Sequence, residues 1–97
     1  MRLAWQSQAK VEFVEALKYY RDQAGLDIAR DFNQATMQAA QRLLDYPEMG
    51  VKTGHRARRF VLHDYPYTLV YRVMPETIII VAVAHHSRRP GYWAGRR

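Results

Sequence analysis

The sequence predicts an α+β fold of the order β-α-α-β-β-β, in which a helical hairpin packs on one face of a small, mainly antiparallel sheet. The first half of the chain carries two stripes of apolar residues at spacings of three and four, which is the period of helices. After Gly50 the apolar residues alternate with a period of two, which is the pattern of strands. Both helices are expected on the same sheet face, because no other element is available to cover their apolar stripes.

The first half begins with a short strand around Leu3 and Trp5, followed by Ser7 as the predicted N-cap of a helix. The stripe of that helix consists of Phe13, Leu17, Tyr20 and Ala24. Gly25 is expected to end it, and Asp27 to cap the second helix after a joint of three residues. The second stripe consists of Ile28, Phe32, Ala35, Ala39 and Leu43. Tyr46-Pro47 ends this helix, because proline disfavours helix at the residue before it.

The second half contains three consecutive strands. Residues 59–62 form a short one, and Asp64-Tyr65-Pro66 marks a turn. Residues 67–73 alternate between two faces, and Met74-Pro75-Glu76 is a tight connection. Residues 77–84 are apolar on both faces, so this strand is predicted to be central in the sheet, with both faces covered.

The composition predicts a single domain over residues 1–97, with residues 89–97 as a basic aromatic C-terminal arm. The absence of cysteine excludes a disulfide scaffold and a cysteine metal cluster. The longest apolar run, residues 78–84, is far too short to span a bilayer. The protein is therefore expected in the cytoplasm, with no membrane partner.

The net charge of +6 lies entirely in the second half. Residues 50–97 contain nine Lys and Arg against two acids, whereas residues 1–49 contain six against seven. Such a patch attracts phosphates or a strongly acidic partner. Four of the cations, Lys52, Arg56, Arg58 and Arg59, lie where a loop enters a strand. A solvated basic loop is the alternative to a binding segment there.

Arginines near the strand ends are the first candidate site residues: Arg59, Arg72 and Arg88. Arg72 alternates with the apolar stripe of its strand, so its side chain is predicted to leave the sheet opposite the helices. There it either lies in solvent with its stem on a neighbouring ring, or meets Arg59 and Arg88 in a shared cationic site. The sequence leaves both alternatives open.

His85 and His86 are adjacent on the last strand, so their side chains leave opposite faces and do not form a metal site together. One of them could transfer a proton near neutral pH, and the alternative is a histidine hydrogen-bonded at a strand end. Tyr92 and Trp93 lie beside Arg89, and such rings and cations suit unstacked nucleobases and phosphates. The alternative is an arm that folds back on the helices and covers apolar surface.

The assembled pattern resembles the RelE/ParE superfamily of bacterial toxins from type II toxin–antitoxin pairs, from Leu3 to about Arg88. The resemblance is carried by Trp5-Gln6-Ser7-Gln8-Ala9, Leu44-Asp45-Tyr46-Pro47-Glu48-Met49-Gly50, Arg59-Phe60-Val61-Leu62, Pro66-Tyr67-Thr68-Leu69-Val70-Tyr71-Arg72-Val73 and Val83-Ala84-His85-His86-Ser87-Arg88. It implies a cytoplasmic toxin, a cognate acidic antitoxin that wraps and neutralises it, and a toxin–antitoxin hetero-oligomer. We expect no cofactor and no metal.

The superfamily divides by mechanism, and the resemblance leaves enzymatic activity open. ParE-like members inhibit DNA gyrase by binding it, and RelE-like members cut mRNA on the ribosome. For an endonuclease the resemblance implies the catalytic set Arg59, Arg72, His85, Arg88 and Tyr92, with histidine or tyrosine as the proton-transfer group. For nucleic-acid or target binding we expect Lys52, Arg56, Arg58, Arg89 and Trp93.

The favoured interpretation is a toxin that arrests growth by binding a target such as DNA gyrase. Arginine holds its proton too tightly to act as a base, and the lysine-rich stretch of RelE-like enzymes is reduced here to Lys52 among arginines. A ribosome-dependent mRNA endonuclease is the first alternative. A small RNA-binding module without toxicity is the second, and it predicts salt-sensitive RNA binding without a ribosome.

Overall fold

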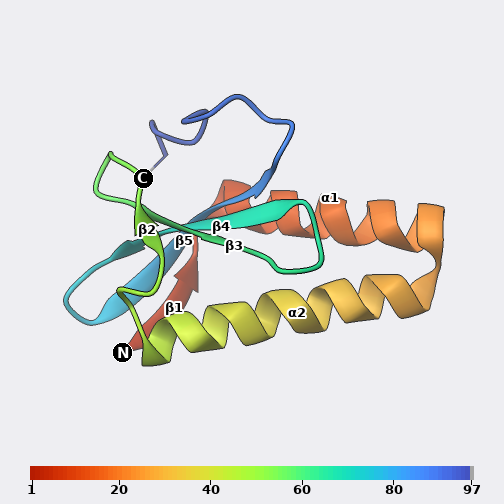
Figure 1. The fold of residues 1–97 in the computed structure, drawn as a ribbon, viewed down its shortest axis with the longest axis horizontal. Coiled ribbons are helices and arrows are strands. Elements are labelled where there is room, and N and C mark those ends of the chain that lie inside the picture. The colour runs from red at the N-terminus through yellow and green to blue at the C-terminus, as the bar shows by residue number, and fades with distance from the viewer. Residues whose placement is uncertain (97) are drawn as a thin grey trace.

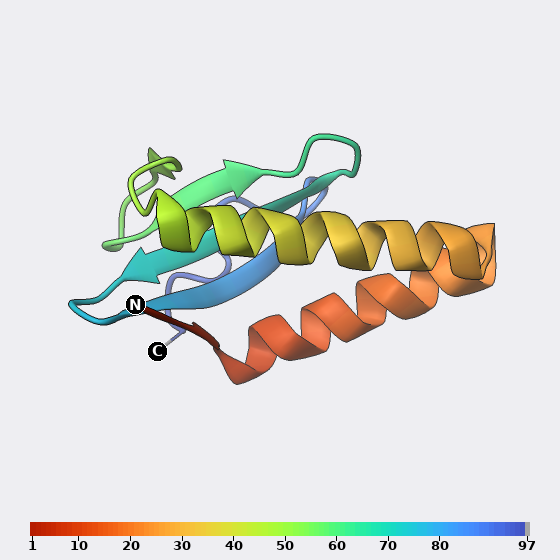
Figure 2. The ribbon, with the colours of Figure 1, turned by 90° about the horizontal axis from the view of Figure 1, so that it is seen from below.

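The computed structural model describes residues 1–96 and confirms the α+β class (Figure 1). Its elements are β1 (Arg2–Trp5), α1 (Ser7–Ala24), α2 (Leu26–Asp45), β2 (Val51–Lys52), β3 (Arg58–Val61), β4 (Tyr67–Val73) and β5 (Thr77–His85). The helical hairpin covers one face of the sheet, as Figure 2 shows, and the chain after β5 passes over the other face. The predicted order is therefore present, with the short strand β2 as an addition.

The sheet has the strand order β1-β5-β4-β3-β2, and only β1 pairs in parallel, with β5, among the described strands. β5 is thus an interior strand, as its apolar residues predict. Ile80 and Val83 face the helices, whereas Val81 and Ala82 are buried on the opposite face. The pairing of β4 with β5 contains a bulge: Val70 pairs with Ala82 and Tyr71 with Ile80, which leaves Val81 without a partner on β4. The bulge explains how Val81 and Ala82 face the same side although they are consecutive.

The structure corrects both predicted helix caps. Gln6, extended at the end of β1, is the N-cap of α1, and its side-chain oxygen accepts from two backbone N–H groups of the first turn. Ser7 is already helical, because the longer Gln6 side chain reaches those donors from one residue earlier. Asp27 caps nothing: the helices are joined by Gly25 alone, whose φ of 96° and ψ of 169° form a conformation open essentially only to glycine.

The main core lies between the helices and the sheet. α2 contributes Phe32, Ala39 and Leu43 to it, as predicted. The predicted apolar stripes of the two helices extend too far toward the joint between them, however. Ala24 at the end of α1 is exposed, and Ile28 at the start of α2 is 40% exposed. Figure 2 shows the reason, since the closed end of the hairpin extends past the sheet. Within residues 1–96, neither helix is long and apolar enough to cross a membrane.

A second, smaller core lies on the opposite face of the sheet. There the C-terminal arm, described here over residues 89–96, packs Trp93 against Val70, Val81 and Ala82, and only 5% of Trp93 is exposed. The Trp93 ring of the arm therefore covers apolar surface of the sheet and not of the helices, which differs from the alternative raised by the sequence. Its position explains how both faces of β5 are covered. Residue 97, the last of the predicted arm, lies outside the described residues.

Candidate functional site

A shallow hollow of about 430 Å³, called the basic groove below, lies on the sheet face opposite the helices. It is lined by Thr53, His55, Arg59, Thr68, Val70, Ala84, His85, His86, Arg88, Arg89, Pro90, Gly91, Tyr92 and Trp93. Three of these residues are arginines, three are histidines, and none is acidic. The groove thus concentrates positive charge and hydrogen-bond donors on one surface.

The three arginines reach the basic groove from two different parts of the chain. Arg59 stands opposite Val70 in the pairing of β3 with β4 and therefore shares its face. Arg88 and Arg89 follow β5, and the guanidinium of Arg88 lies 3.8 Å from the centre of the Tyr92 ring. Within residues 1–96, Arg59 and Arg89 have no carboxylate within 4.0 Å. Their charge is therefore available to a ligand.

Arg72 leaves the predicted face of β4, but it does not line the basic groove. Its Nε donates to the backbone oxygen of His55 at 3.1 Å, and its Nη1 donates to that of Arg96 at 2.7 Å. A longer contact of 3.5 Å joins Nη2 to the backbone oxygen of Ala94. Neither alternative from the sequence describes this residue, because its donors tie the arm to the β2–β3 connection.

Glu12 of α1 is an important residue that sequence reasoning missed. Its carboxylate accepts two hydrogen bonds from Arg96, at 2.7 and 3.0 Å, and both side chains are only 12% exposed. It also accepts from the Tyr92 hydroxyl at 2.5 Å and from the backbone N–H of Val83 at 3.0 Å. Arg96 in turn donates to the backbone oxygen of Val81 at 3.1 Å. This network fastens the arm to α1 and to the edge of β5.

A sequence signal for Glu12 does exist. The residue stands three positions after Ala9 and four before Ala16, and both alanines are buried against the sheet. An acid within such a stripe is expected to have a partner, because an unpaired buried charge is strongly unfavourable. The partner, Arg96, lies 84 positions away.

Tyr92 is held in place by the same network. Burial raises the pKa of its hydroxyl, and the hydrogen bond to Glu12 raises this pKa further. A hydroxyl of this kind keeps its proton at neutral pH and has its donor occupied. Tyr92 therefore serves as a structural hydrogen-bond donor to Glu12 in this structure.

His85 and His86 leave opposite faces, as predicted. His85 lies edge-on to Tyr67, with 5.0 Å between ring centres, and its Nδ1 is within hydrogen-bond distance of Ser87. His86 contacts the Thr68 hydroxyl through Nε2 at 3.1 Å. Only the His86 side chain therefore lies on the face of the basic groove, whereas the His85 ring lies on the helix side, in a hollow that Tyr67 and Glu12 also line. In the part of the chain that is described, no three His, Asp or Glu residues are grouped so that they could hold a metal ion.

The other predicted cations lie apart from the basic groove. Lys52, Arg56 and Arg58 line a separate hollow of about 400 Å³ on the other side of the β2–β3 hairpin. Arg58 is anchored there, because its Nη1 donates to the backbone oxygen of Gly50 at 2.8 Å and of Glu48 at 3.3 Å. The predicted binding set is thus divided between two surfaces.

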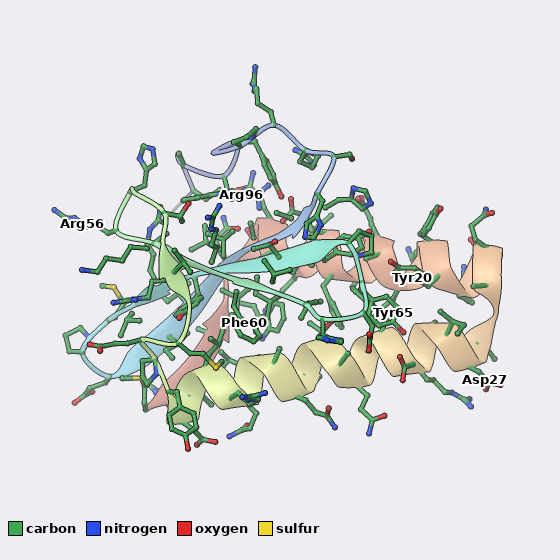
Figure 3. The ribbon with its side chains drawn as sticks, in the orientation of Figure 1. Tyr20, Asp27, Arg56, Phe60, Tyr65 and Arg96 are labelled. Carbon is green, nitrogen blue, oxygen red and sulfur yellow. The ribbon has the colours of Figure 1, made fainter. Side chains whose placement is uncertain are left out.

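The turn of this hairpin contains three consecutive residues with positive φ: Gly54 at 82°, His55 at 52° and Arg56 at 60°. Such a backbone costs roughly 1–2 kcal/mol per non-glycine residue. The backbone N–H of Ala57 closes the turn by donating to the oxygen of Gly54 at 2.9 Å. Its shape sets His55 edge-on to Trp93 at 5.9 Å and sends Arg56 outward at the tip, as Figure 3 shows.

Comparison with known proteins matches the chain to a protein family and to solved structures. A family described as "ParE toxin of type II toxin-antitoxin system, parDE" matches residues 3–90. Among solved structures, one described as "Chromosomal ParDE TA system from P. aeruginosa" superposes with a TM-score of 0.77 at 19% identity, covering 88% of this chain and 95% of that chain. No curated protein matches the sequence.

Proposed function

The chain belongs to the ParE toxin family of type II toxin–antitoxin systems, and from this premise we propose that it arrests growth by binding and inhibiting DNA gyrase. It is the toxin component of such a pair, and membership of the family implies an antitoxin that neutralises it. The surface proposed to contact the target is the basic groove, with Arg59, Arg88 and Arg89 as its cations.

The contacts made by the residues proposed for catalysis support binding over catalysis. The three other groups proposed for an endonuclease all have partners within the fold. Arg72 donates to backbone oxygens, Tyr92 donates to Glu12, and His85 packs edge-on against Tyr67. Arginine remains protonated and supplies charge but no base. A surface of fixed cations suits recognition of an anionic target more than proton transfer.

Cleavage of mRNA on the ribosome is the second candidate function. It is favoured by one observation: the His86 imidazole lies on the same face of the sheet as the basic groove with Arg59 and Arg88. Imidazoles can move protons near neutral pH, and guanidinium groups can stabilise the charge of a phosphate under attack.

The proposed antitoxin is acidic and forms a hetero-oligomer with the toxin in the cytoplasm. Its charge would complement a surface on which Arg59 and Arg89 have no carboxylate partner among residues 1–96. Complementary charge speeds association and favours the correct partner.

Controlled expression in bacteria tests the proposed function. Growth should stop on induction and resume when the antitoxin is co-expressed, and gyrase–DNA breaks should accumulate without new mRNA ends at codons. Arg59→Ala should weaken the arrest, whereas Arg30→Ala, an exposed arginine on α2, should leave it intact. Discrete cuts in ribosome-bound mRNA would favour the endonuclease instead, and harmless expression would contradict both functions.

A further inference from the structure

We propose that the basic groove binds the sugar–phosphate backbone of duplex DNA without reading its sequence. This deepens the proposed function and rests on it, because a gyrase inhibitor meets its target together with DNA. The ligand is identified by three properties of the groove: the donors that line it, the burial of its aromatic rings, and its concave shape.

The donors match phosphate oxygens. Arg59 and Arg89 offer guanidinium groups without a carboxylate partner among residues 1–96, and Arg88 lies beside them on the Tyr92 ring. Guanidinium forks bind phosphate through two parallel hydrogen bonds. Among residues 1–96 none that lines the groove is acidic, and of its three arginines only Arg88 has a carboxylate within 4.0 Å, that of Glu12 at 3.9 Å.

The rings are not available for stacking on bases. Trp93 is 5% exposed and lies in the second core. The Tyr92 ring has the Arg88 guanidinium 3.8 Å from its centre and that of Arg96 at 5.0 Å. Proteins that hold single strands depend on exposed aromatic platforms. The groove lacks such a platform, which favours a duplex, whose bases are already stacked.

The shape favours the backbone over the base edges. Sequence is read by a helix or a two-stranded ribbon that enters the major groove of DNA. The basic groove is a hollow, so it can receive the ridge of a DNA strand but cannot enter the duplex. Its cations are also held in fixed relation, because Arg72 and Glu12 tie the arm to β4 and α1. Contacts of this type position a protein on DNA and are salt-dependent.

Fluorescence anisotropy with a short labelled DNA duplex tests the proposal. Association constants of the full chain should fall with salt at a logarithmic slope of about −3, as expected when three arginines neutralise phosphates. Arg59→Ala/Arg89→Ala should weaken binding about tenfold or more at low salt and flatten the slope by about two. Thermal unfolding of each variant shows that the fold is kept.

The matched control is Lys18→Ala/Arg30→Ala, which removes the same charge from exposed positions on the helices. It should retain the wild-type slope. Equal losses in the two double variants would overturn the proposal, because net charge alone would then explain binding. Tighter binding to a single-stranded RNA or DNA of the same sequence would also overturn it.

The two proposals can fail separately. If gyrase is inhibited but the protein does not bind the free duplex, the groove proposal fails and the proposed function stands. If the duplex binds with the expected slope but neither gyrase nor growth is affected, the groove proposal stands and the proposed function fails.

Discussion

Gly50 lies against the buried hydroxyl of Tyr71 at the joint between α2 and the sheet. This hydroxyl accepts from the backbone N–H of Gly50 at 2.9 Å and donates to the backbone oxygen of Pro47 at 2.7 Å. A Cβ on Gly50 would lie 2.6 Å from the hydroxyl oxygen and 2.8 Å from the backbone oxygen of Arg59. Neither atom belongs to a flexible chain end, so the site has no room for a methyl group.

Gly50→Ala should therefore lower the free energy of unfolding by about 2 kcal/mol, through overpacking and loss of the Tyr71 hydrogen bonds. Urea unfolding monitored by circular dichroism measures the change. Gly95→Ala is the matched control, because no atom lies within 4 Å of a Cβ there. Equal stability of the two variants would show that the backbone at Gly50 can move aside.

Glu12→Ala should lower the free energy of unfolding by about 3 kcal/mol, because it leaves the largely buried Arg96 guanidinium without its anion. Glu15→Ala, which removes an exposed carboxylate one turn later on α1, should change stability by less than about 0.5 kcal/mol. Urea unfolding of both variants in parallel makes the comparison. A small effect for Glu12 would mean that the arm is held by apolar contacts alone.

The sequence identified candidate site residues by type but could not assign their partners. The face of Arg72 followed from strand alternation, whereas its acceptors are backbone oxygens of distant residues. Backbone oxygens carry no sequence signal. Arg59 and Arg89 come together only because the arm turns back over the sheet.

At the scale of elements, the β3–β4 connection is attached to the helices through Tyr65. Its hydroxyl donates to Asp31 of α2, and its ring meets those of Tyr20 and Phe32 edge-on at 5.2 and 5.1 Å. Figure 3 shows Tyr65 beside Tyr20 at the helix layer. Burial, with the hydrogen bond to Asp31, raises the pKa of Tyr65 to about 12.

This raised pKa predicts loss of stability in alkaline solution. An unfolded tyrosine releases its proton near pH 10, so the contribution of Tyr65 is complete below about pH 10 and declines as the pH rises to about 12. Tyr65→Phe should be less stable at pH 8 but should lose less stability over that alkaline interval. Urea midpoints across the pH range measure it, and an identical alkaline decline in both proteins would contradict the assignment.

Long elements were predictable because their periods extend over many residues. The alternation in residues 67–73 and the apolar run after Thr77 located β4 and β5, and proline limited α2. β2 has only two residues, which is too short for a period to be visible. The N-caps were missed because the prediction used the preference for Ser and Asp at N-cap positions. That preference does not cover Gln6, which caps α1 with a longer side chain, or Gly25, which begins α2 through a backbone conformation.

At the scale of the whole molecule, the arm acts as a third layer over the sheet. Trp93→Ala should lower the free energy of unfolding by about 3 kcal/mol, because it opens a cavity above Val70 and Val81. Trp93→Phe should recover a large part of that loss. Thermal and urea unfolding measure both variants. Wild-type stability of the alanine variant would mean that the ring is not buried in solution.

The position of this third layer could not be predicted from the sequence. The residues Tyr92 and Trp93 look the same in a sequence whether their rings pack internally or face a ligand. Which of the two occurs depends on Glu12, about eighty positions earlier. Packing against the sheet also uses apolar positions of β5 that no helix covers. The three-layer arrangement is thus a property of long-range pairing, which local patterns do not contain.

The Glu12–Arg96 pair also has a bearing on solubility. β1 pairs with β5 only as far as Ile80, so the next part of that strand edge has no neighbouring strand. Arg96 and Glu12 occupy the backbone groups of Val81 and Val83 there. Bare strand edges recruit other chains and aggregate. Two charged side chains therefore close an edge through which copies of this chain would otherwise associate during purification.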